Sequence, residues 1–212
     1  MPHVHRSDAH GGFDAWAATY DRSGLQGLFF DRVHARVVRE LRRVLRGSPG
    51  APVVVDVGCG TGRLLARLRG AFPGATLIGV DASAEMIAVA ARKDALAGVR
   101  LLEASAASLP LDDGSCDVVV STISFHHWEN QAGGLREVSR VLRPGGHLLL
   151  VDAFAGGPWR ALLRRWGSKH GVGLRSHAEL VALVHGGSLQ ALSYSRVGPP
   201  TSPLGVMTAV RA

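Results

Sequence analysis

The heptapeptide DVGCGTG, residues 56–62, joins a short apolar segment to the start of a helical pattern. Its glycines stand at every second position, and glycine in such a turn lets the backbone approach a ligand closely. Residues 52–57 have the β-branched composition of a buried strand, and residues 62–72 carry leucines at helical spacing. A strand that runs through glycines into a helix is the basic unit of open α/β sheets, and ligands bind at its turn.

The same alternation of strand and helix continues along the chain. Apolar segments predict further strands at residues 75–81, 99–104, 115–123, 147–154, 188–197 and 205–212. Periodic segments predict helices at residues 13–45, 83–97, 130–142, 158–171 and 176–187. Strands separated by helices pair in parallel with helices on both faces, whereas a loop joins the last two strands and implies an antiparallel edge strand. We therefore predict an α/β, Rossmann-like, doubly wound and mostly parallel seven-stranded sheet, in a single domain that spans residues 1–212.

The composition excludes several classes of protein. No window reaches the roughly 18 apolar residues that a membrane span requires, and the polar residues 1–12 lack the apolar part of a signal peptide. The net charge is +7, but the arginines are scattered along helical faces, so we expect no nucleic-acid partner. Peripheral contact with lipid stays open for the basic helix at residues 158–171. The two cysteines imply no disulfide framework, which favours a cytoplasmic location.

Three classes of ligand could occupy the glycine-rich turn: a dinucleotide, a nucleoside triphosphate or a cationic sulfonium cofactor. Arg63 stands where the dinucleotide fingerprint G-x-G-x-x-G has its third glycine, and the turn lacks the G-K-[ST] ending of a P-loop. Asp56, two residues before Gly58, would oppose a pyrophosphate but suits a cation. Asp81 ends the next predicted strand, where a carboxylate can accept hydrogen bonds from both ribose hydroxyls. These features favour S-adenosylmethionine, which carries an ammonium and a sulfonium and no phosphate.

Four blocks of sequence resemble the class I S-adenosylmethionine-dependent methyltransferases. They are VVDVGCGTGRLL at residues 54–65, IGVDASAEMI at 78–87, the stretch from LLEASAASLP to FHHW at 101–128, and EVSRVLRPGGHLLLVDAF at 137–154. The chain is similar in particular to the small-molecule methyltransferases of type 11, a group that includes the ubiquinone and menaquinone C-methyltransferases. The resemblance implies a helical cap at residues 1–46, a cofactor-binding core at 51–154, and substrate-side helices and edge strands at 155–212.

The resemblance also implies roles for residues around the predicted crevice. The methionine end of the cofactor would be held at the turn, by Asp56, Gly58, Cys59, Gly60, Thr61 and Gly62. Asp81 would bind the ribose, and the residues that border the adenine would be Ala82, Met86, Ser105 and Ala106. Ser121 and Thr122 would lie near the sulfonium, and Tyr20, in the segment FDAWAATYD that resembles the family's closing segment, would cap the site. Many relatives have aspartate where this chain has Ser105, so we expect weaker cofactor binding at most.

The acceptor side of the crevice offers His126 and His127, which follow the predicted strand at residues 115–123. An imidazole titrates near neutrality, so either histidine could deprotonate a hydroxyl or an acidic carbon, although one could equally pack against the sheet. We expect no metal site, because adjacent histidines are poor ligands for one ion and no third ligand is evident. The predicted reaction is in-line transfer of a methyl group to a small-molecule acceptor.

Other interpretations of the same residues stay open. Asp56 and Asp81 could cap helices, and Tyr20 could pack beside Trp16. The chain could be a non-catalytic S-adenosylmethionine-binding regulatory protein, because methyl transfer requires no universal catalytic residue. It could also be an NAD-dependent oxidoreductase, although Asp56 and Arg63 disfavour that function.

Overall fold

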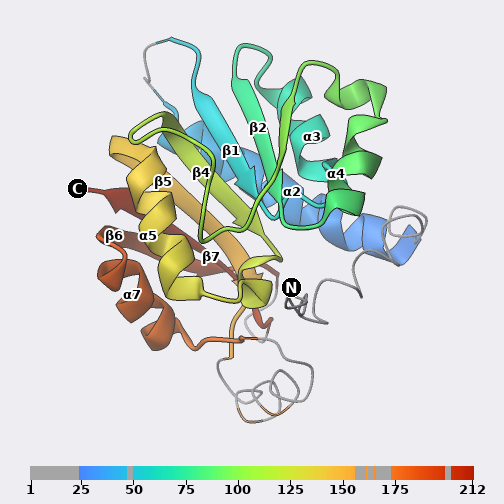
Figure 1. Cartoon of the computed structure of the whole chain (residues 1–212). Helices are drawn as coiled ribbons and strands as arrows, with labels where there is room; N and C mark the ends of the chain where they lie inside the picture. The colour runs from blue at the N-terminus through green and yellow to red at the C-terminus, as the bar shows by residue number, and fades with distance from the viewer. Residues whose placement is uncertain (1–23, 47–49, 156–160, 162–164, 166–172, 199–201) are drawn as a thin grey trace, which may run out of the picture.

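The computed structural model describes residues 24–46, 50–155, 161, 165, 173–198 and 202–212. Its seven strands are β1 (Val53–Val57), β2 (Thr76–Asp81), β3 (Arg100–Glu103), β4 (Cys116–Thr122), β5 (Leu142–Ala153), β6 (Leu189–Arg196) and β7 (Leu204–Arg211). They form one sheet in the order β3-β2-β1-β4-β5-β7-β6. The pairs from β3 to β5 are parallel, and β7 runs antiparallel to both β5 and β6, as its reversed arrow shows (Figure 1). The predicted mostly parallel, seven-stranded sheet with an antiparallel edge pair is confirmed.

Helices cover both faces of this sheet, as predicted. They are α2 (Gly24–Val44), α3 (Arg63–Ala71), α4 (Ala84–Ala91), α5 (Gln131–Val141) and α7 (His177–Gly186), with short 3-10 helices η1 (Asp94–Leu96) and η2 (Phe125–His127). One hydrophobic cluster joins the sheet to α5 and α7, and a second joins its other face to α2, α3 and α4. Figure 1 shows α5 and α7 in front of the sheet and α2 behind it.

The continuously apolar strands are explained by burial on both faces. In β5, Leu148 and Leu150 belong to the cluster with α5 and α7, whereas Leu149 and Val151 belong to the cluster with α2 and α3. All four side chains are fully buried. Because successive residues of a strand point to opposite faces, a central strand covered on both sides shows no polar alternation.

Two predicted elements differ from the observed ones. The strand predicted at residues 147–154 begins at Leu142, directly after α5, because Leu142 pairs with Cys116 across a register irregularity before the pairing of His147 with Val118. The single helix predicted at residues 83–97 is two helices, α4 and η1. The break between them lets Leu96 pack under the glycine turn, where a side chain at Gly62 would overlap it. Both differences arise from tertiary contacts that override local periodicity.

Parts of the predicted helical regions lie outside the described residues, namely residues 13–23 and most of 158–171. Within the described part of the chain, no helix is long and apolar enough to cross a membrane.

The strand order reverses between β1 and β4. From β1 the chain passes outward to β2 and β3 and then returns to β4 on the other side of β1. At such a switch point the loops at the carboxyl ends of the two strands lead in opposite directions and leave a crevice between them. The glycine turn follows β1, and η2 follows β4, so both lie at this crevice.

Candidate functional site

A cleft of about 510 Å³ opens at the carboxyl ends of β1, β2 and β4. Eleven residues predicted to contact the cofactor border it: Asp56, Gly58, Cys59, Gly60, Thr61, Asp81, Ala82, Met86, Ser105, Ala106 and Thr122. His126 and His127 border it as well. Two predicted residues, Gly62 and Ser121, do not line the cleft, and Tyr20 lies outside the described residues.

Among its three glycines, the turn has open space beside the backbone at Gly60 in the described part of the chain. Gly58, Gly60 and Gly62 all have positive φ, a conformation that side chains disfavour. The space beside Gly58 is filled by Ser124 and that beside Gly62 by Leu96, whereas a Cβ on Gly60 would meet no atom within 4 Å. Gly60 is therefore the point at which a ligand can lie directly against the main chain.

Substitution of Gly58 by alanine should destabilise the protein. The new Cβ would overlap the Ser124 side chain, and Gly58 has a φ of +77°. Overpacking of this kind costs about 1–3 kcal/mol, before the backbone strain is added. Thermal unfolding measures the loss. Gly70→Ala, in α3 with open space around it, is the control and should be neutral or stabilising. Equal unfolding temperatures for the two variants would contradict this account of the turn.

Asp81, the last residue of β2, is hydrogen-bonded to the glycine turn. Its Oδ2 accepts a hydrogen bond from Gly60 N–H at 2.7 Å, and its Oδ1 accepts one from Ser83 N–H at 3.0 Å. The residue that caps α4 is Ser83, whose hydroxyl accepts from Met86 N–H, so Asp81 is not the cap. Asp81 therefore connects the glycine turn to the start of α4.

Asp56 is a buried carboxyl with an unpartnered atom. It is 2% exposed, and its Oδ1 has no hydrogen-bond partner among the residues that the structure describes. Burial, and then the charge of nearby Asp81, raise its pKa to about 8. The cap of α3 is Gly62, so Asp56 does not serve that helix. An orphaned carboxyl oxygen beside a second carboxyl fits a cationic group of a ligand and disfavours a phosphate.

The hydroxyls at the end of β4 are also unsatisfied. Ser121 Oγ and Thr122 Oγ1 are buried and have no hydrogen-bond partner. The next residue, Ile123, has a φ of 51°, an unusual conformation for a β-branched side chain. Its N–H donates to Val151 O at 2.7 Å, which fixes the strained turn to β5. Strain of this kind concentrates where a fold shapes a ligand site.

His126 is held by a buried aspartate that lies in strand β5. Its Nδ1 lies 2.5 Å from Asp152 Oδ1, and its backbone N–H donates to Asp152 Oδ2 at 3.0 Å. Asp152 is 0% exposed and belongs to β5. A carboxylate at Nδ1 favours the tautomer that carries its proton there and leaves Nε2 as an acceptor. The pKa of neighbouring His127 is lowered to about 4, first by burial and then by His126.

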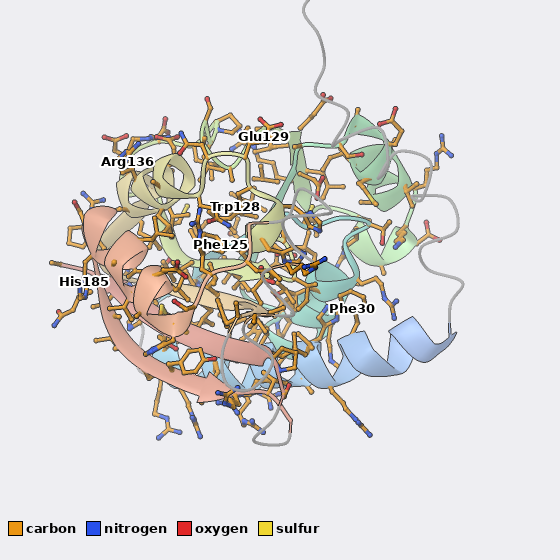
Figure 2. The ribbon with its side chains drawn as sticks, turned by 90° about the horizontal axis from the view of Figure 1, so that it is seen from below. Phe30, Phe125, Trp128, Glu129, Arg136 and His185 are labelled. Atoms are coloured by element: carbon orange, nitrogen blue, oxygen red, sulfur yellow. The ribbon has the colours of Figure 1, made fainter. Side chains whose placement is uncertain are left out.

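Gln131 organises the acceptor side of the cleft. Its Nε2 donates to Phe125 O at 3.0 Å and Gly173 O at 2.8 Å, and its Oε1 accepts from Arg175 Nε at 2.6 Å. Gln131 is 4% exposed, so these bonds hold residues 173–175 firmly against η2. Figure 2 places Trp128 and Glu129 on the α5 side of the strand ends and Phe30 towards α2 and α3.

Several residues of the site were missed in the sequence. They are Phe30, His34, Arg63 as a lining residue, Ile123, Ser124, Asp152, Gln131 and Arg175. For Asp152 a signal existed, because a single acidic residue near the carboxyl end of an apolar strand is typical of a site residue. For Ile123 none existed, because the sequence favours a strand there.

Histidine, cysteine and acidic side chains form no group of three that could hold a metal ion in the described part of the chain.

The sheet is doubly wound, its last two strands form an antiparallel pair, and the glycine turn meets an acidic residue of the next strand at the switch point. Solved methyltransferases share this Rossmann-like fold. Residues 55–150 match the model of the family described as "Methyltransferase domain". The chain is also similar in sequence to quinone C-methyltransferases.

Similar proteins agree on the fold and differ in what they act on. The demethylmenaquinone methyltransferase of Chlorobaculum tepidum is 37% identical over 150 residues, which are 69% of this chain and 60% of the relative. A chain of the complex between the Haloferax volcanii Trm112 methyltransferase activator and a methyltransferase superposes with a TM-score of 0.73 at 23% identity, over 94% of this chain and 97% of that one. Geranyl diphosphate C-methyltransferase from Streptomyces coelicolor, solved with S-adenosyl-L-homocysteine, superposes with a TM-score of 0.69 at 17% identity, over 86% and 80%.

The chain spans about three fifths of the length of the demethylmenaquinone methyltransferase.

Proposed function

We propose that the chain is an S-adenosylmethionine-dependent methyltransferase that methylates a small molecule. The observation that carries this proposal is the pair Asp56 and Asp81, two carboxyls beside one glycine turn on one cleft. Two adjacent carboxyls suit a cofactor that has an ammonium and a ribose better than they suit the pyrophosphate of NAD. A cytoplasmic location stays a prediction from the cysteine content.

The cofactor supplies an activated methyl group on a sulfonium. Asp56 would face its ammonium, and Asp81, which borders the cleft, would accept the ribose hydroxyls. Gly60 allows the amino-acid part to lie against the backbone. The residues that would border the adenine are Ala82, Met86, Ser105 and Ala106, and Thr122 would lie near the methyl group. Alignment of donor and acceptor is the main task of such a site and supplies roughly 7–11 kcal/mol in favourable cases.

The acceptor approaches from the side of η2. We place the proton-accepting role on His126, because Asp152 holds Nδ1 and fixes the ring, so that Nε2 is the acceptor in the neutral tautomer. This role suits an acceptor whose nucleophile is a hydroxyl or an acidic carbon, either of which must lose a proton. His127 stays the second candidate, and the relatives' acceptors are too different to select one molecule.

Calorimetric titration tests the cofactor. We expect S-adenosylmethionine and S-adenosylhomocysteine to bind and NAD to show no heat of binding. Binding of NAD alone would overturn the proposal. A panel of acceptors with radiolabelled methyl donor, demethylmenaquinone and phenols included, then separates an enzyme from a regulatory binding protein.

Cofactor binding should release a proton at neutral pH. The pKa of the Asp56 carboxyl is about 8 in the free protein, so it is mostly protonated at pH 7, and the ligand's ammonium requires the carboxylate. The affinity for S-adenosylhomocysteine should therefore rise by up to about tenfold per pH unit between pH 5.5 and 7.5 and level off near 8. Calorimetry in buffers with different ionisation enthalpies counts the protons released.

The same carboxyl should set a pH dependence of stability. A folded-state pKa above the unfolded value means that the folded protein holds an extra proton between about pH 4 and pH 8. The free protein should therefore lose stability as the pH rises through this window. In Asp56→Asn the amide does not titrate, and both this decline and the proton release should disappear, while Asp112→Asn, on an exposed turn, should keep both.

A further inference from the structure

Arg63 carries a buried nitrogen that nothing in the described structure satisfies. It is the first residue of α3, directly after the glycine turn, and it borders the cleft. Its Nη1 is buried and has no hydrogen-bond partner. Leaving a charged donor buried without a partner costs more than leaving a neutral one, so such a group is expected to meet an acceptor.

The neighbours of Arg63 do not offset its charge. Its guanidinium carbon lies 5.8 Å from the centre of the Phe30 ring, which provides a face but no acceptor. His34, 5% exposed, also borders the cleft, and burial first and then Arg63 and Arg67 lower its pKa to about 4. His34 is therefore neutral at pH 7. One turn further along α3, Arg67 is already paired with Asp31 at 3.0 Å.

The cleft is therefore polarised across the glycine turn. Asp56 stands before the turn with an unpartnered carboxyl oxygen, and Arg63 stands after it with an unpartnered guanidinium nitrogen. Between them, Gly60 leaves open space beside the backbone. A ligand that fits this arrangement has a cationic and an anionic group on one short skeleton, as an α-amino acid does.

We propose that Arg63 binds the carboxylate of the amino-acid end of the cofactor, opposite the ammonium that faces Asp56. The inference rests on the proposed function. A guanidinium binds a carboxylate through two parallel hydrogen bonds, which fixes the orientation of the amino-acid end as well as its affinity. An acidic acceptor could use the same chemistry, but Arg63 adjoins the turn after β1, whereas the acceptor side is built by η2 and residues 173–175.

Two nucleosides test the proposal by calorimetry. S-adenosylhomocysteine carries the carboxylate, and 5′-deoxy-5′-methylthioadenosine is a closely matched nucleoside that lacks the amino-acid part. Arg63→Ala and Arg63→Gln should lower the affinity for S-adenosylhomocysteine by about ten- to a hundredfold and leave the affinity for methylthioadenosine unchanged. Arg63→Lys keeps the positive charge but loses the planar guanidinium group. Its affinity for S-adenosylhomocysteine should therefore lie between that of the unaltered protein and that of Arg63→Ala. Arg67→Ala is the matched control on the same helix and should change neither affinity.

Three results would overturn the inference, each in a distinct way. An unchanged affinity for S-adenosylhomocysteine in Arg63→Gln would mean that the guanidinium serves another anion, such as an acidic acceptor. An equal loss for both nucleosides would mean that Arg63 only maintains the shape of the cleft, which thermal unfolding of the variant would then report. Failure of the unaltered protein to bind either nucleoside would overturn the proposed function itself.

Discussion

Replacement of Asp81 by alanine is expected to lower the affinity for S-adenosylhomocysteine by about two to four orders of magnitude, since each hydrogen bond to a charged group contributes about 1.5–3 kcal/mol and the ribose offers two. The residue also holds Gly60 N–H at 2.7 Å, so its loss loosens the turn on which the ligand lies. Calorimetric titration measures the effect directly.

The nucleoside part alone should reveal the same loss. Asp81→Ala should weaken methylthioadenosine as strongly as S-adenosylhomocysteine, because both contain the ribose. Arg63→Ala should lower only the affinity for S-adenosylhomocysteine. Asp112→Ala, on an exposed turn with no side-chain hydrogen bond of its own in the described structure, is the control. An unchanged affinity in Asp81→Ala would mean that the crevice has been assigned to the wrong part of the sheet.

Substitution of His126 by asparagine should reduce kcat by about a hundred- to ten-thousandfold with any acceptor that must lose a proton, which is the range of general base catalysis. Asp152→Asn should reduce kcat by a large part of the same factor. The asparagine amide can donate to Nδ1 of His126 and so favours the tautomer that carries its proton on Nε2. Neither change should alter the affinity for S-adenosylhomocysteine. Single-turnover methyl transfer with an acceptor from the panel measures kcat apart from binding.

His127→Asn is the matched control for this prediction. His127 shares η2 with His126, and the two rings lie 4.0 Å apart, but the ring that contacts Asp152 is that of His126. It should lose less than about tenfold in kcat. A greater loss in His127→Asn than in His126→Asn would transfer the role to His127. Nitrogen-15 spectra of the histidine rings give a separate test, since His126 should carry its proton on Nδ1 in the unaltered protein and not in Asp152→Asn.

The fold was predictable because its signals are local. The apolar runs of β1, β4 and β5 are short and bounded by glycine, proline or polar residues, so their type could be recognised without knowing their neighbours. The start of β5 could not be recognised, because Leu142 becomes a strand residue only by pairing with Cys116. Pairing partners that are distant in sequence leave no mark in a local pattern.

The residues of the site were likewise predictable only where the local sequence marks them. Asp56 and Asp81 could be identified because motif spacing places them at strand ends. The contact of Asp152 with His126 joins residues 26 positions apart, and nothing in either segment specifies the other. Arg63 illustrates a further limit. In the sequence, Arg63 shows only that the third glycine of the dinucleotide fingerprint is absent. In the described structure, its guanidinium has a buried nitrogen without a hydrogen-bond partner. Buried polar atoms without a hydrogen-bond partner arise from tertiary packing, so the spacing of residues in the sequence does not predict them.

The position of β7 between β5 and β6 affects how the protein is assembled during synthesis. β6 leaves the ribosome before β7, yet its hydrogen-bonded neighbour in the sheet is β7 alone. The edge of β5 likewise stays open until β7 pairs with it, from His147 to Ala153. Phe154 N–H, just beyond β5 on the acceptor side, bonds Pro203 O immediately before β7. The parallel strands β1 to β4 can therefore pair early, whereas β5 and β6 complete their pairing only after β7 has been translated.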